Sequence, residues 1–159
     1  MIEKELGEIL TGKNLKIAVA ESCSGGLIGH RITNVPGASR YFLGDVVAYD
    51  NEVKINLLGV PREVIIKHGA VSEECARYMA EGVRKLLGAD VSVATTGIAG
   101  PTGGTKEKPV GLVYMAVSYK TVEVRKYLFK GSRLEIKNQT AENAMKFVVE
   151  VLSDECCEQ

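Results

Sequence analysis

Apolar positions recur along the chain with two periods, which predict a series of helices and short buried strands. Residues 2–11 and 133–153 carry apolar side chains every three or four positions, which is the spacing of amphipathic helices. Short runs rich in apolar and β-branched residues predict strands at 15–20, 41–49, 91–96, 110–119 and 122–129. Between the strands, helical spacing predicts helices that open near Gly26, Asn51, Pro61 and Ser72.

The order of these elements predicts an α/β fold. Helices separate the first three strands, whereas the polar stretch at 118–121 between the last two strands favours an antiparallel hairpin. We therefore expect a three-layer α/β/α architecture with a mixed, mostly parallel sheet. The length of 159 residues fits one domain with one core, so we expect residues 1–159 to form a single domain.

Composition narrows the classes of function. Apolar residues make up 45% and charged residues 25% of the chain, as in an ordinary globular protein. The net charge of zero supplies no basic surplus that would attract nucleic acid. No apolar run reaches the roughly 18 residues of a membrane span, and the acidic start lacks the features of a signal peptide. We expect a cytoplasmic protein with neither a membrane nor a nucleic acid as partner.

The cysteines form no recognisable metal or redox motif. They are Cys23, Cys75, Cys156 and Cys157. No C-x-x-C pair occurs, and neither histidine stands at zinc-site spacing from a cysteine. We expect no metal, and we interpret the adjacent pair Cys156–Cys157 as part of a frayed helix end.

The segment Ala20–Gly26 (AESCSGG) joins a predicted strand to a predicted helix. Free backbone N–H groups at a helix start can hold a phosphate or a developing oxyanion, and glycine lets a ligand approach the main chain closely. A plain helix cap would need one serine, and this turn has two serines, a cysteine and two glycines. The pattern is neither the G-x-S-x-G nucleophile elbow nor a Walker A loop.

Two further segments follow predicted strands. The glycine-rich loop at 97–109 lacks the G-x-G-x-x-G dinucleotide fingerprint, and its length is typical of a loop that binds an anion or covers a substrate. The segment Tyr49–Lys54 leads from a strand into a helix. A lysine removed from water loses affinity for its proton and can act as a base. Taken alone, however, Lys54 is better interpreted as a solvated surface lysine.

Four segments occur together in the order and spacing of one known family. They are AESCSGG (Ala20–Gly26), YDNEVK (Tyr49–Lys54), HGAVS (His68–Ser72) and TGIAGPTGG with KPVG (Thr96–Gly111). In these segments the chain resembles the CinA C-terminal domain family, over roughly residues 15–135. Characterised members of that family are nicotinamide-nucleotide amidohydrolases, also called NMN deamidases. The chain resembles the stand-alone form rather than the longer relatives that carry a second, molybdopterin-binding-like domain.

The resemblance implies hydrolysis of the carboxamide of nicotinamide mononucleotide, a small-molecule nucleotide, without a metal or organic cofactor. It implies that Ser22 is the nucleophile, Lys54 the base and Tyr49 an active-site tyrosine, with Ser39 as a rival nucleophile. We expect the substrate to contact Ser24, Gly25, Gly26, Ser39, Thr96, Gly97 and Arg133, the last at the phosphate. Family members are often oligomeric, so a homo-oligomer is expected.

The chain departs from the family pattern at three positions. Ser24 stands where threonine is common, Asp50 where serine is common, and Ser132 where an aspartate precedes the arginine. The first change keeps a hydroxyl, and we expect Asp50 to point away from Lys54, because a facing carboxylate would raise the pKa of that lysine. Two alternatives stay open: a cysteine hydrolase that uses Cys23, and a nucleotide-binding module without catalysis.

Overall fold

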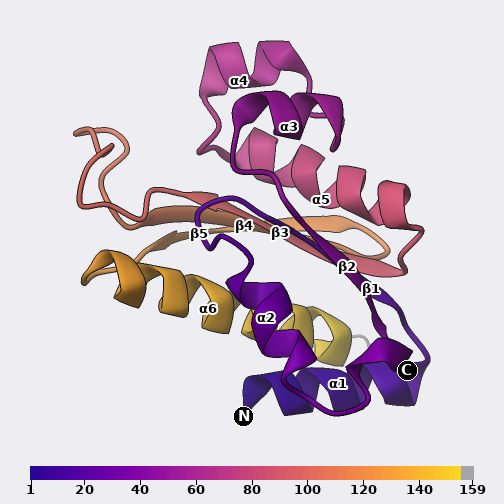
Figure 1. Cartoon of the computed structure of the whole chain (residues 1–159). Helices are drawn as coiled ribbons and strands as arrows, with labels where there is room; N and C mark the ends of the chain where they lie inside the picture. The colour runs from indigo at the N-terminus through magenta and orange to yellow at the C-terminus, as the bar shows by residue number, and fades with distance from the viewer. Residues whose placement is uncertain (155–159) are drawn as a thin grey trace.

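The computed structural model describes residues 1–154 and forms three layers (Figure 1). The predicted frayed end at Cys156–Cys157 lies outside the described residues. Helices α1, α2 and α6 cover one face of the sheet, and α3, α4 and α5 cover the other. In the described part of the chain, no helix combines the length and apolar character that crossing a bilayer requires.

The helices have the following bounds: α1 Ile2–Lys13, α2 Leu27–Thr33, α3 Asn51–Asn56, α4 Arg62–His68, α5 Glu73–Leu87 and α6 Arg133–Asp154. A short 3-10 helix, η1, spans Ala38–Arg40. The strands are β1 Ile17–Glu21, β2 Phe42–Val47, β3 Val91–Gly97, β4 Leu112–Ser118 and β5 Val122–Leu128.

The five strands form one mixed sheet in the order β2-β1-β3-β4-β5. Strand β1 pairs in parallel with both β2 and β3, and the β3–β4 and β4–β5 pairs are antiparallel. Strand β4 is therefore the one strand of this sheet that runs against the others. The predicted α/β class, the mixed and mostly parallel sheet and the hairpin at 118–121 are confirmed.

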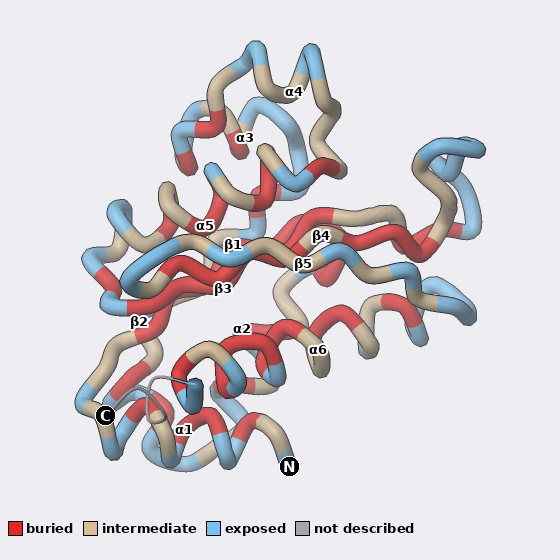
Figure 2. The backbone as a smooth tube through the Cα atoms, turned by 180° about the vertical axis from the view of Figure 1, so that it is seen from behind, coloured by how far each residue is buried: buried red, intermediate tan, exposed pale blue. Residues whose placement is uncertain are grey.

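Two apolar cores lie on the two faces of the sheet, as the buried central strands in Figure 2 indicate. One core packs α1, α2 and α6 against the sheet through side chains such as Phe147 and Ile28. The other packs α5 against it through Met79 and Val83. The central strands β1 and β3 are buried on both faces, which is why they read as continuous apolar runs in the sequence.

Gly82 allows the chain that follows α3 to pack closely against α5. A methyl group at this position would lie 1.8 Å from the carbonyl oxygen of Leu58, so the chain that follows α3 rests directly on the backbone of α5. Asp50 begins α3 as a helix cap, because its side chain accepts a hydrogen bond from the Glu52 N–H at 2.8 Å. These two contacts set where Lys54 of α3 faces.

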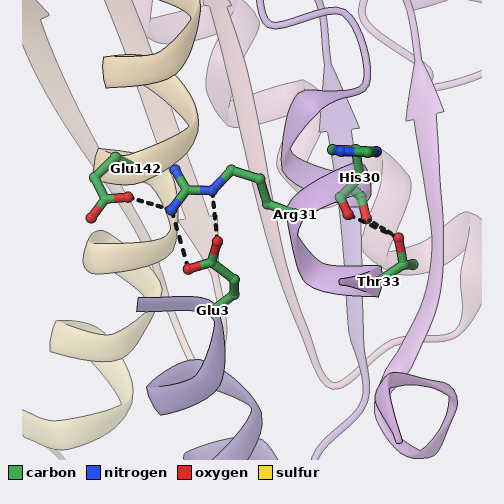
Figure 3. Close-up of polar contacts among 6 residues, drawn as sticks. Glu3, His30, Arg31, Thr33 and Glu142 are labelled. Carbon is green, nitrogen blue, oxygen red and sulfur yellow. Dashed lines mark hydrogen bonds and ion pairs between the residues drawn. The ribbon is translucent and has the colours of Figure 1, made fainter. Parts of the chain in front are cut away.

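A charged contact joins the three helices on the opposite face (Figure 3). The Arg31 guanidinium of α2 donates to both carboxylate oxygens of Glu3 in α1, at 2.9 and 3.1 Å, and also to Glu142 of α6. The Glu3 side chain is 8% exposed. Because a bidentate pair fixes geometry as well as charge, this contact orients α2, whose start carries the Ser22 turn.

Candidate functional site

A cavity of about 200 Å³ opens where the parallel strands end. It is lined by Ser22, Cys23, Tyr49, Asn51, Lys54, Ala70, Val71, Thr96, Gly97, Ala99 and Arg133. Strands β1, β2 and β3 run in one direction, so the segments that follow them meet at one edge of the sheet. Strand β5 shares that direction, which places the first residue of α6, Arg133, at the same edge.

The Ser22 turn is fixed by its own backbone. The Ser22 N–H donates to the carbonyl oxygen of Thr95 at 3.1 Å, and the Ser22 carbonyl accepts from the Gly25 N–H at 3.1 Å. Gly25 and Gly26 have φ angles of 62° and 100°, which side chains other than glycine rarely adopt. The turn leaves Ser22 only 8% exposed, on the wall of the cavity.

Lys54 is the most unusual residue of the site, because it is a lysine with 1% exposure. Its Nζ donates to the carbonyl oxygen of Tyr49 at 3.1 Å. Burial lowers the pKa of Lys54, since the protonated form loses its hydration. Asp50 is turned to its capping contact, as expected, and among the described residues no ion pair joins it to Lys54, although its charge opposes part of the shift.

Arg133 links three segments across the mouth of the cavity. Its guanidinium donates to the carbonyl oxygen of Gly100 at 2.7 Å and to the hydroxyl oxygen of Tyr49 at 3.1 Å. In the described part of the chain no carboxylate forms an ion pair with it, so its positive charge is available to an anionic ligand. Tyr49 is 60% exposed and stands at the rim.

The third wall comes from the end of β3. The Thr96 hydroxyl donates to the carbonyl oxygen of Ala70 at 2.8 Å and so ties β3 to the connection between α4 and α5. A methyl group at Gly97 would lie 2.7 Å from the carbonyl oxygen of Leu112 and 3.1 Å from Cys23 Sγ. Glycine is therefore needed at position 97 for close packing of this wall.

The environment of Cys23 disfavours a thiolate. Burial, and next the charge of Glu21, raise the pKa of Cys23 to about 12. The other buried thiol, Cys75, has its pKa raised to about 11, again mainly by burial. Both thiols therefore keep their protons at neutral pH, which weakens the cysteine-hydrolase alternative.

Four positions expected to contact substrate do not line this cavity. Ser24 is fully buried, and its hydroxyl donates to Glu21 beneath the turn. Gly25 and Gly26 form the turn behind Ser22. Ser39 lies in η1, which precedes β2. This segment is next to the start of β1, because the Ile17 N–H donates to the carbonyl oxygen of Tyr41. The structure therefore places Ser39 at the opposite edge of the sheet from Ser22 and does not bring the two together.

Several wall residues were not singled out from the sequence. They are Asn51, Ala70, Val71 and Ala99. All four lie within segments that carry the family resemblance, so those segments held the available signal. Among the residues that the structure describes, no three His, Cys, Asp or Glu side chains cluster as metal ligands would.

Comparison with known proteins gives one consistent family. The model of a family described as the CinA C-terminal domain matches residues 1–152. A CinA-like protein of Dictyoglomus thermophilum is 49% identical over 148 residues, which is 92% of this chain and 36% of that protein. The chain thus spans little more than a third of the length of the curated relatives it matches.

Two solved structures share the fold of this chain over nearly its whole length. A competence/damage inducible protein from Agrobacterium tumefaciens is 37% identical, with a TM-score of 0.91 over 96% of this chain and 95% of that one. A CinA superfamily protein from Klebsiella pneumoniae is 30% identical, with a TM-score of 0.93 over 96% of both chains.

Proposed function

This chain belongs to the CinA C-terminal domain family, and we propose that it hydrolyses the carboxamide of nicotinamide mononucleotide to nicotinate mononucleotide and ammonia. One observation carries the proposal. Ser22 and Lys54 line the same cavity, and Lys54 is a buried lysine whose pKa is lowered. A serine hydroxyl needs a neighbouring base to attack an amide, and a neutral amine can serve as that base.

The reaction divides into two steps at Ser22. Neutral Lys54 takes the hydroxyl proton while Ser22 Oγ bonds to the carboxamide carbon, and the carbonyl oxygen becomes an oxyanion. The C–N bond then breaks, and ammonia leaves with the proton that Lys54 returns. Water cleaves the resulting ester with Lys54 again as base, which releases the carboxylate and restores the hydroxyl.

The shape of the site supports a substrate with an anionic tail. A cavity of about 200 Å³ is small and accommodates the nicotinamide ring rather than a whole nucleotide. The ribose phosphate would extend past the rim, where Arg133 carries a charge that no carboxylate of the described residues neutralises. Binding energy from that remote group would hold the amide against Ser22.

An ammonia-release assay tests the function. The purified chain is incubated with nicotinamide mononucleotide, and separately with free nicotinamide, which lacks the phosphate. We expect ammonia from the mononucleotide and at least about tenfold less from nicotinamide. The variant Ser22→Ala should lose activity by about 10⁴-fold or more, since a residue that forms the covalent bond has no substitute. Mononucleotide binding without ammonia release would instead identify a non-catalytic binding module.

The partner and the assembly belong to the same proposal. We propose a small-molecule nucleotide as the ligand and a homo-oligomer as the assembly, because members of this family are often oligomeric. Light scattering of the purified chain measures the mass directly, and a monomer at micromolar concentration would contradict the second part.

A further inference from the structure

Two acidic side chains lie together beneath the Ser22 turn, on neighbouring strands. Glu21 ends β1 and is completely buried, and Asp45 lies in β2. Asp45 is in register with Val19, and Val47 with Glu21, so the two acids are diagonal neighbours on one face of the sheet. Neither residue lines the cavity, and the mechanism above uses neither of them.

Glu21 is the anchor of the Ser22 turn and of the start of α2. Its carboxylate oxygens accept from the Ile28 N–H at 3.1 Å and the Gly29 N–H at 3.2 Å. The Ser24 hydroxyl also donates to Glu21, and Thr95 Oγ1 lies 3.1 Å from the Ser24 oxygen on its other side. Because the Ser24 proton goes to Glu21, the Thr95 hydroxyl must be the donor in that second contact.

Asp45 is packed against the same helix start without a partner for one oxygen. Its Oδ1 is buried and accepts no hydrogen bond from any residue that the structure describes. A methyl group at Gly29 would lie 2.5 Å from Asp45 Oδ2, so only a glycine leaves room for this carboxyl. An ionised carboxylate can only accept hydrogen bonds, and here it would stand unsatisfied beside a second negative charge.

No basic side chain of the described residues pairs with either acid. On the same face, Arg31 of α2 is held by Glu3 and Glu142, and Lys137 of α6 lies over Gly25. In the described part of the chain neither of them, nor the exposed His30, forms an ion pair with Glu21 or Asp45. A proton can satisfy both acids at once, because a protonated carboxyl becomes a donor.

We propose that Asp45 holds a proton and donates it to Glu21, and that this acid pair is the positioning element of the Ser22 turn. Glu21 then accepts from Ser24, Ile28, Gly29 and Asp45, and it precedes Ser22 directly in the chain. Loss of the shared proton would put two negative charges side by side, displace the Glu21 carboxylate and loosen the turn that holds Ser22. Burial, and next the adjacent Glu21, raise the pKa of Asp45 to about 9, against a weaker opposing effect of the Gly29 N–H.

The pair therefore predicts an alkaline limit. The folded chain holds a proton on Asp45 that the unfolded chain releases near pH 4, so stability falls as pH rises from about 4 to about 9. The activity readout of this inference rests on the proposed amidase function, and the stability and titration readouts do not. All three are measured on the whole chain.

The test uses Asp45→Asn, which keeps a hydrogen-bond donor that cannot ionise, and Asp154→Asn as the matched control on an exposed residue. Between pH 8 and pH 10, the ratio of variant to wild-type kcat/KM should rise about tenfold for Asp45→Asn and stay constant for Asp154→Asn. Urea unfolding should diverge over a lower range: from about pH 4 to about pH 9, wild type loses the stability that the Asp45 proton supplies and Asp45→Asn does not. Glu21→Gln should lower kcat by about tenfold or more with little change in KM.

A site-specific titration tests whether Asp45 holds the proton, and it needs no activity measurement. Carbon-13 labelling of the aspartate carboxyls should show one aspartate that titrates far above pH 4 and disappears in Asp45→Asn. An Asp45 signal that titrates near pH 4, or an alkaline stability loss identical in wild type and Asp45→Asn, would overturn the proposal. Absence of ammonia release together with a raised Asp45 titration would refute the amidase function and leave the acid pair intact.

Discussion

Lys54 donates a hydrogen bond through Nζ to the carbonyl oxygen of Tyr49, and the 3.1 Å contact holds the amine inside the cavity. The bond runs from the last turn of α3 back to the residue that precedes its cap, Asp50. The same carbonyl belongs to the tyrosine whose hydroxyl accepts from Arg133. The position of the buried amine is therefore coupled, through one residue, to the arginine at the rim.

The protonation state of Lys54 predicts the acid side of the pH profile. Burial lowers the pKa of Lys54 below its ordinary 10.5, and the amine must be neutral to accept the Ser22 proton. We expect kcat/KM to rise with pH until Lys54 has lost its proton, and the acid pair of Asp45 and Glu21 then sets the fall at alkaline pH. The contribution of Lys54 to stability should rise above that limb, up to about pH 10.5, because in that range the unfolded chain still binds the proton that the folded chain has lost.

Substitution of Lys54 separates this base from a structural lysine. Lys54→Met keeps the length of the side chain and removes the amine, so we expect a loss of about 10² to 10⁴ in kcat and unchanged or higher stability at neutral pH. Lys67→Met, at an exposed position of α4, is the control. A Lys54→Met variant with near-normal turnover would remove the proposed base.

Long helices and strands with regular apolar spacing can be predicted from the sequence. The helix expected at 133–153 is observed at Arg133–Asp154, because its apolar spacing is long and regular. The strand expected at 15–20 extends to Glu21, since that carboxylate is satisfied by N–H groups seven and eight residues further along. Such a partner cannot be inferred from the local pattern, which marks a glutamate as the start of a loop.

The sequence predicts which segments form the site, but only part of how they are arranged. The turn at Ser22, the segment at Tyr49–Lys54 and the end of β3 meet because parallel strands end at one edge, and that follows once the class of fold is known. The strand order does not follow from the sequence, and it is the order and direction of β2 that separate Ser39 from the cavity. The burial of Lys54 depends on how α3 rests on α5, which likewise is a tertiary contact.

Arg133 predicts a selective effect on substrate affinity. Its guanidinium contacts uncharged oxygens of Gly100 and Tyr49, so its charge is free to meet a phosphate at the rim. A charge-assisted hydrogen bond is worth about 1.5–3 kcal/mol, so Arg133→Ala should raise KM for the mononucleotide by about 10- to 100-fold. Steady-state kinetics with nicotinamide riboside, which has no phosphate, should show a much smaller change.

A matched charge change on the same helix controls this measurement. Lys146→Gln removes one positive charge from an exposed position of α6, far along the helix from Arg133. It should leave KM for the mononucleotide within about twofold, because exposed charges more than a Debye length away are screened at physiological salt. Equal effects of Arg133→Ala on the mononucleotide and the riboside would exclude a phosphate contact.

Cys23 predicts resistance to thiol reagents. The pKa of about 12 leaves almost no thiolate at neutral pH, and the side chain is 6% exposed. Iodoacetamide at pH 7 should therefore modify neither Cys23 nor Cys75 in the folded chain, whereas both should react in urea. Peptide mass spectrometry separates these two sites from the cysteines near the carboxyl terminus. Rapid modification of Cys23 with parallel loss of activity would instead support a cysteine hydrolase that uses Cys23.

Gly82 predicts the largest effect of a single methyl group on stability. In Gly82→Ala the new carbon would meet the Leu58 carbonyl oxygen at 1.8 Å, and backbone cannot yield as a flexible side chain can. We expect a loss of about 2 kcal/mol or more in the free energy of unfolding, measured by urea titration. Gly12→Ala is the matched control, because it is also a helical glycine and its methyl group would meet nothing within 4 Å. That variant should gain up to about 1 kcal/mol, since alanine is the better helix former.

Because α3 would have to lift from α5, Gly82→Ala should also expose Lys54 and move the acid limb of the activity profile to higher pH. A Gly82→Ala variant as stable as Gly12→Ala would contradict the contact on which the burial of Lys54 depends.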